Sequence, residues 1–430
     1  MSNSKIVAGI DIGSSKITSI VASYSQEKEA LNITGVSVVQ SRGLRKSQII
    51  DIEEAVEVIT ESVEGAERMA GFALSSAFIS IGGIHINSVN SKGVVAVADP
   101  EVEITQNDVK RVLESARAIS LPSSREILHV IPRNFIVDSQ GGIKDPLGMI
   151  GTRLEAEAHI ISGAATSIRN LTRCISEIGV DVDGLVFTGL AAAGAVLSET
   201  EKELGVCLVD IGGGTTDICV FQEGSLSYSS VLPVGANNVT NDLAIGLRVS
   251  LESAEKIKKF LGKEEKKPVL PGDREMKKKA DEVDLSSLKL SEDLKTVSRK
   301  TVVEGIIRPR LNEIFAMIGG ELKKSGFGGA TPAGVVLTGG GAETVGAMNS
   351  CKCVLSMPVR IGIPKGISGL IDEIESPAFA SSIGLVLYGI KHGEPTSSKI
   401  SLRSVGKFVE KIPVRGMANK AIDFIKSFLP

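Results

Sequence analysis

The segment at residues 11–16 reads DIGSSK, and the segment at residues 210–217 reads DIGGGTTD, 199 positions later. Each follows an apolar run typical of a buried strand and precedes a second short apolar run, which predicts two β-hairpins with small residues at their tips. A single Asp-x-Gly turn would indicate little, because many turns contain it. Two copies in matching strand contexts predict that the chain contains two related halves.

The composition of both hairpin tips suits a phosphate chain. Glycine lets backbone N–H groups approach phosphate oxygens, hydroxyls add donors, and an aspartate at a strand end can hold Mg²⁺ directly or through water. We therefore predict that the two hairpins face each other and bind the phosphates of a nucleotide between them. Asp11 and Asp210 are the residues predicted to hold Mg²⁺. The predicted phosphate-site residues are Asp11, Gly13, Ser14, Ser15 and Lys16 in the first hairpin, and Asp210, Gly212, Gly213, Gly214, Thr215, Thr216 and Asp217 in the second.

A third glycine run follows a strand-like segment at residues 335–341, VVLTGGG. A strand that enters a glycine turn and then a helix start allows close backbone approach to a flat ring or a sugar. Alone, this would often be an ordinary turn, but after two phosphate hairpins it completes a nucleotide site. The residues predicted to approach that ring or sugar are Gly339, Gly340, Gly341 and Ala342.

These three elements resemble, in order, the phosphate-1, phosphate-2 and adenosine motifs of the actin/Hsp70/sugar-kinase superfamily, over about residues 5–390. The resemblance implies an α/β, actin-like ATPase fold with two RNase-H-like halves around a cleft that binds ATP and Mg²⁺. It also implies that residues 250–260 form the helix that contacts ribose and base, through Glu255 and Lys258. An exposed helical ion pair is the alternative interpretation of those two residues.

A segment with a different pattern of predicted elements interrupts the first half at about residues 84–161. Short strand candidates at residues 84–89, 93–98 and 127–135 surround one predicted helix at residues 107–118, which Thr105 can cap. We therefore predict a small α+β insertion. Residues 262–300 form a second unusual segment, dense in both signs of charge, which is either a solvated surface or a docking surface.

The placement of the insertion and the charge-dense segment resembles the FtsA family, the actin-like proteins of bacterial cell division. The segments SIGG (80–83), SAEKIK (253–258) and PAGVVLTGGG (332–341) strengthen this resemblance. It implies the following division of the chain: subdomain 1A at 1–83 and 162–195, subdomain 1C at 84–161, subdomain 2A at 196–240 and 301–390, and subdomain 2B at 241–300.

The resemblance also implies a function: ATP-dependent polymers on the cytoplasmic face of the membrane at the division septum. They would anchor the tubulin-like protein FtsZ, whose C-terminal tail would bind subdomain 2B, and recruit later division membrane proteins through subdomain 1C. A PilM-like adaptor of pilus assembly, which shares the fold, is one alternative. A sugar-kinase-type enzyme is another, although no sugar pocket is evident in the sequence.

Hydrolysis is expected to be weak or slow at most. In related actin-like ATPases a glutamate before an alanine-rich helix orients the attacking water, whereas residues 188–193 here read TGLAAA. Phosphoryl transfer depends heavily on positioning, so loss of that carboxylate should slow turnover. No catalytic residue is assigned.

The C-terminal residues predict a membrane-binding segment. Residues 391–404 read as a flexible linker, and residues 405–430 as an amphipathic helix interrupted by Pro413. Lys399–Pro430 carries seven Lys or Arg against two acids, a net charge of +5 that anionic lipids attract. Docking on the protein's own core is the alternative. The predicted membrane-contacting residues are Phe408, Val409, Ile412, Met417, Ile422, Phe424, Ile425, Phe428 and Leu429.

Composition excludes several other classes. The whole chain carries a formal charge of −3 and only 15 aromatic residues (12 Phe, 3 Tyr, no Trp), which argues against nucleic acid as a partner. Four scattered histidines make a histidine-rich metal site improbable, and five cysteines without a CxxC are typical of reduced thiols in a cytosolic protein. No apolar run is long enough to span a bilayer and no secretory signal is evident, so we expect a peripheral association with the membrane.

Overall fold

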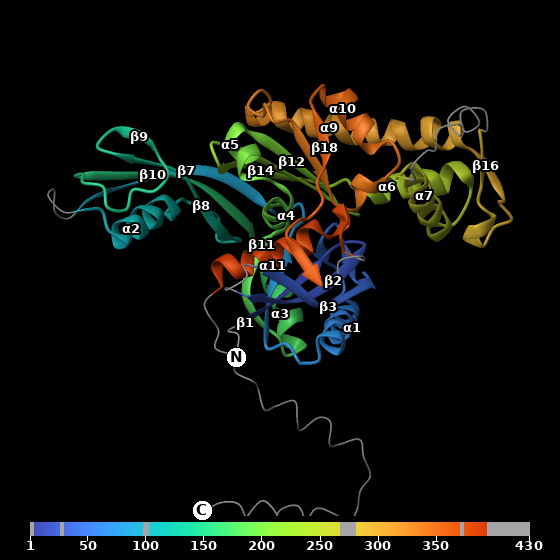
Figure 1. Cartoon of the computed structure of the whole chain (residues 1–430), viewed down its shortest axis with the longest axis horizontal. Coiled ribbons are helices and arrows are strands. Elements are labelled where there is room, and N and C mark those ends of the chain that lie inside the picture. The colour runs from blue at the N-terminus through green and yellow to red at the C-terminus, as the bar shows by residue number, and fades with distance from the viewer. Residues whose placement is uncertain (1–3, 26–29, 98–102, 267–280, 370–373, 394–430) are drawn as a thin grey trace, which may run out of the picture. The chain divides into compact units, whose positions relative to one another are not determined.

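Two sheets that share a five-strand order, to which β19 adds a sixth strand in the first, form the framework of the computed structural model, which describes residues 4–25, 30–97, 103–266, 281–369 and 374–393 (Figure 1). The first sheet has the order β11-β6-β1-β2-β3-β19, and the second has the order β14-β13-β12-β17-β18. In each, three consecutive antiparallel strands are extended by two parallel ones on the side of the first strand. The repeated order confirms the prediction of two related halves.

The strands of the first sheet are β1 (Ser4–Ile12), β2 (Lys16–Ser25), β3 (Ala30–Gln40), β6 (Ser76–Ile81), β11 (Asp181–Phe187) and β19 (Ile367–Gly369). The strands of the second are β12 (Val206–Ile211), β13 (Thr216–Gln222), β14 (Ser225–Leu232), β17 (Val335–Thr338) and β18 (Val359–Ile361). Every residue of β12 is buried, and successive side chains enter two different hydrophobic cores, one on each face of the second sheet. A strand covered on both faces reads as a continuous apolar run, as this one does.

Two helices, α4 (Thr188–Val196) and α11 (Ala380–His392), lie between the two sheets (Figure 1). On the other face of the first sheet, α1 (Ile52–Ala70) packs on β2 and β3, beside α3 (Ala165–Glu177). The bounds of α1 follow from its own sequence, because Asp51 caps its N-terminus and Gly71 ends it in the left-handed region at φ 84°. The shared inner layer holds both hairpin ends against the same helix, α11.

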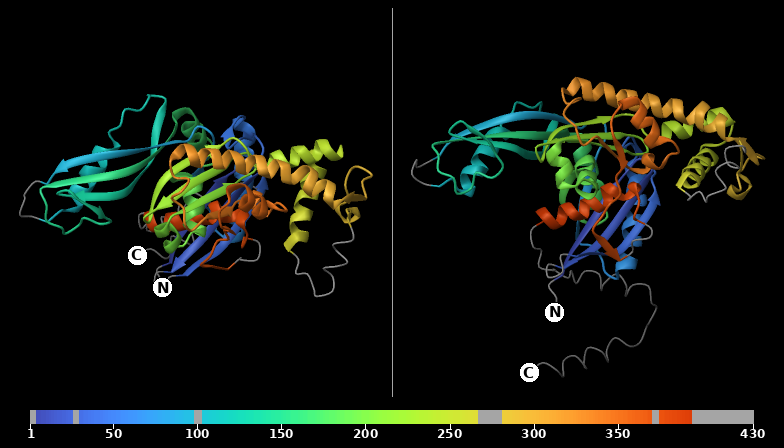
Figure 2. Two further views of the ribbon diagram at one scale, coloured as in Figure 1. Left: turned by 90° about the horizontal axis from the view of Figure 1, so that it is seen from above. Right: turned by 45° about the horizontal axis from the view of Figure 1, so that its top comes forward.

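The inserted segment folds into its own sheet, of order β7-β10-β8-β9, with helix α2 packed against β7 and β10 (Figure 2). Its elements are β7 (Asn87–Ala96), α2 (Gln106–Arg117), β8 (Arg125–Val137), β9 (Gln140–Ile143) and β10 (Arg153–Ala164). The Thr105 cap is confirmed, as a capping box with Asp108. The two strands predicted at 84–89 and 93–98 are instead the single strand β7, and β10 was not predicted.

Hydrogen bonds join the insertion to the edge strand β14 of the second half. The Ser88 hydroxyl donates to the Ser229 carbonyl (2.7 Å), and the buried His159 lies between the Asn90 and Ser229 side chains, at 2.7 and 2.9 Å. Burial lowers the pKa of His159 to about 3, so the ring stays neutral. The insertion is therefore attached to both halves.

Between β14 and α9, the structure describes α6 (Ala236–Leu247), α7 (Leu251–Lys266), β15 (Glu282–Asp284), η1 (Ser286–Leu288) and β16 (Thr296–Ser298), and the last three lie within the charge-dense segment at 262–300. Residues 236–266 form two helices rather than one, because Arg248 adopts a left-handed conformation (φ 57°) that separates α6 from α7. The next helical segment begins as the π-helical η2 (Lys300–Ile307) and continues directly into α9 (Arg308–Ser325).

The remaining elements are the short hairpin of β4 (Leu44–Arg45) and β5 (Gln48–Ile49), α5 (Glu199–Leu204), η3 (Gly340–Glu343), α10 (Ala347–Leu355) and η4 (Pro377–Phe379). Helix α11 continues through His392, so the first two residues of the predicted linker are helical. Residues 394–404 of that linker and the predicted membrane helix at 405–430, with all its membrane-contacting residues, lie outside the described residues. Among the helices that are described, none has the length and apolar character needed to cross a membrane. All five cysteines are free thiols.

Candidate nucleotide-binding site

The two predicted hairpins have the same turn geometry. In the first, the Gly13 N–H donates to the Lys16 carbonyl (3.1 Å), and in the second the Gly212 N–H donates to the Thr215 carbonyl (2.9 Å). Asp11 lies opposite Thr18 in the first hairpin, and Asp210 lies opposite Asp217 in the second. Each pair of equivalent positions differs by 199, as the sequence repeat predicted.

The tips of the two hairpins meet. A Cβ atom on Gly213 would lie 1.9 Å from the Ser15 Oγ, and one on Gly214 would lie 2.8 Å from the Ser14 Oγ. Ser15 also donates its hydroxyl to the Asn237 side-chain oxygen (3.2 Å), on the first turn of α6. Glycine at these two positions is what allows the serine hydroxyls of one half to reach the backbone of the other.

One helix binds the aspartates of both hairpins. The Ser381 hydroxyl donates to Asp210 (2.9 Å), and the next residue, Ser382, donates to Asp11 (3.0 Å). Burial raises the pKa of Asp210 to about 7, and the neighbouring charge of Asp11 adds to that increase. Two carboxylates from opposite halves are thus brought side by side at the start of α11.

A third carboxylate joins them. Asp217 is buried, and its Oδ1 atom has no hydrogen-bond partner among the described residues. Burial, together with the charges of Asp210 and Asp11, raises the pKa of Asp217 well above its usual value. An unpartnered buried carboxylate oxygen is costly unless a cation or a donor arrives.

These residues fit Mg²⁺ only in company with water and phosphate. Within the described ranges, no three or more His, Cys, Asp and Glu side chains are placed to hold a metal ion by themselves. Mg²⁺ usually keeps several waters and takes one or two carboxylates plus substrate phosphates, so a ready-made protein cage is not required. When bound, the ion would neutralise the carboxylates and the phosphate oxygens, with Asp11, Asp210 and Asp217 as the residues around it.

Lys16 supplies positive charge beside these carboxylates. Its ammonium lies 3.5 Å from the centre of the Phe379 ring, in a cation–π contact. Burial lowers the pKa of Lys16 to about 8, although the charge of Asp11 opposes the shift. Lys16 therefore remains largely protonated at neutral pH and favours an anionic ligand.

The predicted adenosine loop lies beside the second hairpin. Strands β12 and β17 are parallel, and Asp210 is in register with Thr338, so both strands end at the same edge. Gly339 has a left-handed backbone (φ 80°), and a Cβ atom there would lie 2.1 Å from the Asp210 Oδ1. The loop and the aspartate are therefore adjacent, as a nucleotide bound across both would require.

Glu255 and Lys258 form an ion pair of 2.6 Å, and Lys258 is buried. Lys258 also donates to the Thr240 hydroxyl (2.8 Å) and to the Ala236 carbonyl (3.3 Å), both on α6. The alternative of an exposed ion pair is therefore wrong. The pair stabilises α6, whose Ala236 N–H donates in turn to the Gly212 carbonyl (2.9 Å) of the second hairpin. Contact of either side chain with ribose or base remains a prediction.

Thr216 departs from the prediction. Its hydroxyl is buried and donates to the Val234 carbonyl (2.8 Å), because successive residues of β13 point to opposite faces of the sheet. That hydroxyl is therefore not directed at the phosphate site. By contrast, Ser14, Ser15 and Thr215 lie at the hairpin tips.

Three polar residues of the site were not predicted: Ser381, Ser382 and Asn237. The two serines lie in a run of small and apolar residues without a motif, and only their position at the start of α11 brings them to the aspartates. The first turn of α4 contains no acidic residue, in agreement with the absence of a water-orienting glutamate noted in the sequence.

Comparisons with known proteins identify relatives over nearly the whole chain. A family described as "SHS2 domain inserted in FTSA" matches residues 83–162, and one described as "Cell division protein FtsA" matches residues 207–384. The chain is 38% identical to cell division protein FtsA of Pseudomonas aeruginosa over 95% of both chains. It is 40% identical to that of Borreliella burgdorferi over 92% of this chain and 93% of the relative.

Among solved structures, the chain resembles the PilM-PilN type IV pilus biogenesis complex, with a TM-score of 0.62 over 89% of this chain and 98% of the other. The two are 13% identical, so this likeness shows the fold alone. The duplicated sheets and the inserted domain identify that fold as actin-like.

Proposed function

The chain belongs to the FtsA family of cell division proteins, and on that basis we propose that it binds Mg²⁺-ATP and polymerises on the cytoplasmic face of the membrane at the division septum. In this role it anchors FtsZ filaments and recruits later division proteins. The observation that carries the nucleotide proposal is the convergence of both hairpins on α11, where Ser381 and Ser382 bind Asp210 and Asp11. The absence of an acidic residue in the first turn of α4 favours slow hydrolysis at most.

The proposed membrane anchor is the segment at 405–430. One interfacial helix of this size binds a membrane reversibly, whereas many of them on one filament bind far more tightly through avidity. The charge distribution supports this, because residues 399–430 carry +5 while the rest of the chain carries −8. Adhesion to anionic lipid is therefore confined to the C-terminal segment.

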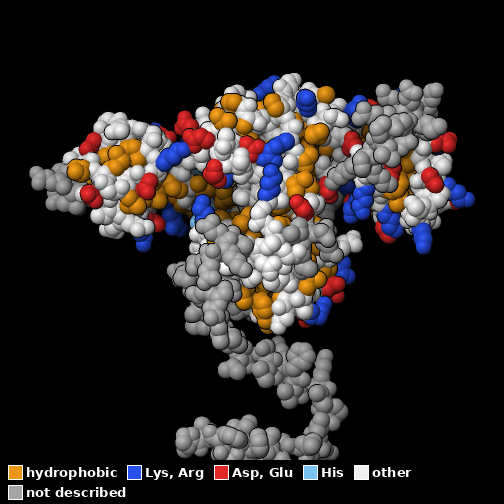
Figure 3. Space-filling model, in the orientation of Figure 1, with side chains coloured by type: hydrophobic (Ala, Val, Ile, Leu, Met, Phe, Trp, Pro, Cys, Tyr) orange, Lys and Arg blue, Asp and Glu red, His pale blue; other side chains and the backbone are white. Residues whose placement is uncertain are grey.

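The proposed FtsZ site is the surface of α6 and α7. Ile245 (77% exposed) and Leu251 (58% exposed) lie there beside exposed Arg248 and Lys259. Figure 3 shows basic and acidic side chains mixed around this part of the molecule. Ile245→Asp with Leu251→Asp should weaken binding of the FtsZ C-terminal peptide, measured by fluorescence anisotropy. Leu204→Asp, on the comparably exposed Leu204 (59%) of α5, is the matched control.

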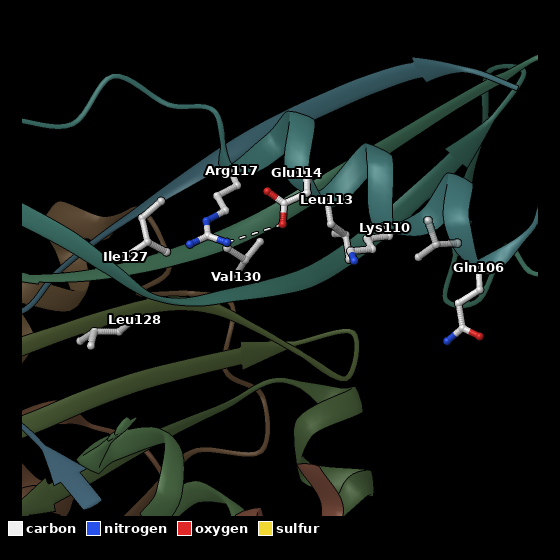
Figure 4. Close-up of a pocket in the computed structure, with 9 residues that line it drawn as sticks. Gln106, Lys110, Leu113, Glu114, Arg117, Ile127, Leu128 and Val130 are labelled. Carbon is white, nitrogen blue, oxygen red and sulfur yellow. Dashed lines mark ion pairs between the residues drawn. The ribbon is translucent and has the colours of Figure 1, made fainter. Parts of the chain in front are cut away.

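The proposed site for later division proteins is a groove of about 520 Å³ in the inserted domain. It lies between α2 and β8, and Figure 4 shows Leu113, Ile127 and Val130 with the Arg117–Glu114 ion pair (3.5 Å) along it. An apolar groove with charged edges suits a peptide segment. Leu113→Asp should reduce capture of the cytoplasmic segments of such proteins, whereas Leu147→Asp, on the exposed loop after β9, should not.

One experiment tests the proposal as a whole. The full chain is sedimented with anionic liposomes, ATP and the FtsZ C-terminal peptide, and the pellet is examined by electron microscopy for filaments. Deletion of residues 405–430 should abolish sedimentation while ATP binding is retained. Sedimentation that persists without the tail, or binding of a pilus-protein peptide in place of the FtsZ peptide, would contradict it. Strict dependence of ATP consumption on a small-molecule acceptor would instead indicate a sugar-kinase-type enzyme.

A further inference from the structure

A short turn, Lys46–Ser47, lies against both phosphate hairpins although no part of the nucleotide motif includes it. The turn joins β4 to β5, and both residues have left-handed backbones, with φ of 49° and 57°. Turns of this kind usually carry Gly, which has no Cβ, or Asn, whose short polar side chain tolerates the left-handed conformation, because that conformation is disfavoured for most other residues. Such outliers persist where the surrounding structure imposes them, and they cluster at ligand sites.

Ser47 connects the two halves of the site. Its N–H donates to the Ser14 Oγ (2.7 Å), and its hydroxyl lies 3.3 Å from both the Ser14 Oγ and the Thr215 Oγ1. Ser14 belongs to the first hairpin and Thr215 to the second. The three hydroxyls therefore form a continuous chain across the point where the hairpins meet.

Two glycines leave space for the turn to pack closely against its neighbours. A Cβ atom on Gly83 would lie 2.9 Å from the Lys46 carbonyl oxygen, and one on Gly214 would lie 3.3 Å from the Lys46 Cα. Gly83 is the last residue of the SIGG segment. Because it has no side chain, the Lys46–Ser47 turn can approach the end of β6. Gly214 does the same from the second hairpin.

The turn lies where the far end of a nucleotide is expected. The adenosine loop packs on Asp210 and Ile211 at the base of the second hairpin, since Cβ atoms on Gly339 and Gly341 would meet those residues. A nucleotide with its base at that loop extends its phosphates toward the hairpin tips. The hydroxyls of Ser14, Ser47 and Thr215 lie at those tips, where the terminal phosphate of such a nucleotide would be placed.

A small cavity behind the turn leaves room for adjustment. It has a volume of about 70 Å³ and is lined by Ser47 and Gln48 on one side and by Ser80, Gly82 and His85 on the other. This is space for about two water molecules, since each occupies roughly 30 Å³ in the liquid. Ser47 can therefore shift away from Ser14 and Thr215 when a phosphate group enters.

We propose that the Lys46–Ser47 turn is a third phosphate-binding element, which contacts the terminal phosphate of a nucleoside triphosphate and makes the site prefer ATP to ADP. The inference rests on the proposed function, because it assumes that the cleft binds a nucleotide. The Ser47 hydroxyl and N–H supply donors, and the half-buried Lys46 supplies a second cation in addition to Lys16. A triphosphate beside three aspartates requires such additional positive charge.

The test compares affinities for Mg²⁺-ATP and Mg²⁺-ADP by isothermal titration calorimetry. Ser47→Ala and Lys46→Ala should each weaken ATP binding by roughly tenfold, the order expected for a lost charge-assisted hydrogen bond, and leave ADP binding within about twofold. Arg45→Ala removes an exposed charge from the same hairpin and should change neither affinity. Ser47→Gly removes the hydroxyl but relieves the left-handed backbone, so it should weaken ATP binding by a similar factor while raising thermal stability.

The outcomes distinguish failure of the proposed function from failure of the proposed role of the Lys46–Ser47 turn. If the unmodified chain binds neither nucleotide, the proposed function fails. If it binds both and the Ser47 and Lys46 variants lose ATP and ADP affinity equally, or lose neither, the proposed role of the turn is overturned while nucleotide binding stands. Loss of stability in Ser47→Ala that Ser47→Gly restores together with full ATP affinity would likewise overturn it, because the hydroxyl would then be unnecessary.

Discussion

The two hairpins share a backbone but carry complementary side chains. Ser14 and Ser15 of the first occupy the positions of Gly213 and Gly214 in the second, and each serine packs on the glycine of the other loop. Identical loops with serine at all four positions would collide. The difference shows how a duplicated element becomes an interface: one copy keeps the hydroxyls, and the other loses its side chains to receive them.

The strand residues after each tip differ in charge. Lys16 of the first hairpin corresponds to Thr215 of the second, and the buried Thr18 corresponds to the buried Asp217. Thr18 and Asp217 each have a side-chain oxygen without a hydrogen-bond partner among the described residues. The first half therefore contributes the cation and the second half contributes the additional carboxylate, so that only the assembled pair can balance a metal ion and phosphates.

The largest expected effect comes from removal of the Asp210 carboxylate. Asp210→Ala should weaken Mg²⁺-ATP affinity by roughly 100-fold, because the variant loses a carboxylate that we propose to hold Mg²⁺. Titration calorimetry with and without Mg²⁺ measures this, and the deficit should shrink when the metal is absent. Asp181→Ala, at an exposed position on β11, is the control. Unchanged affinity would remove Asp210 from the site.

The pH dependence of stability should also reflect Asp210. Its pKa in the folded chain is raised to about 7, so its protonated form stabilises the unliganded fold at low pH, and that contribution is lost as pH rises through about 7. Between pH 5 and pH 8 the free energy of unfolding should therefore fall by about 2 kcal/mol more in the wild type than in Asp210→Asn. Urea denaturation measures the difference, and parallel curves would contradict it.

The complementarity of the tips can be broken and restored. Gly213→Ala should weaken ATP binding by roughly tenfold, because its Cβ meets Ser15 and prevents the hairpins from approaching. Adding Ser15→Gly should recover most of the loss. Gly194→Ala in α4, where a Cβ meets nothing within 4 Å, is the neutral control. If the double variant binds no better than Gly213→Ala, the two loops do not pack as described.

The smallest effects should distinguish the two serines of α11. Ser381→Ala should cost about 1 kcal/mol and lower the Tm by about 2 °C, because it removes a donor to the fully buried Asp210. Ser382→Ala should cost less, since Asp11 is partly exposed and water can replace the hydroxyl. Differential scanning calorimetry of both variants checks the order, and a larger loss in Ser382→Ala would reverse the comparison.

Much of the fold could be predicted because its signals are local. The α1 helix has a capping aspartate and a terminal glycine within its own sequence, and β12 is a short apolar run bounded by charge and glycine. The failures have physical causes too. A left-handed arginine at position 248 carries no signal in the sequence, and the strand β10 joins two others through pairings that its own residues do not reveal.

The duplication, the two hairpins and the glycine loop at 339–341 are evident in the amino-acid sequence, because each depends on residues that are neighbours in the chain. Which polar groups meet depends on the tertiary structure. Ser381 lies 171 positions from Asp210, and Ser382 lies 371 positions from Asp11, so no periodicity or motif connects them. The same holds for Ser47, which is 168 positions from Thr215. Such contacts are produced by the packing of whole sheets around α11, where burial makes each unmet hydrogen bond costly.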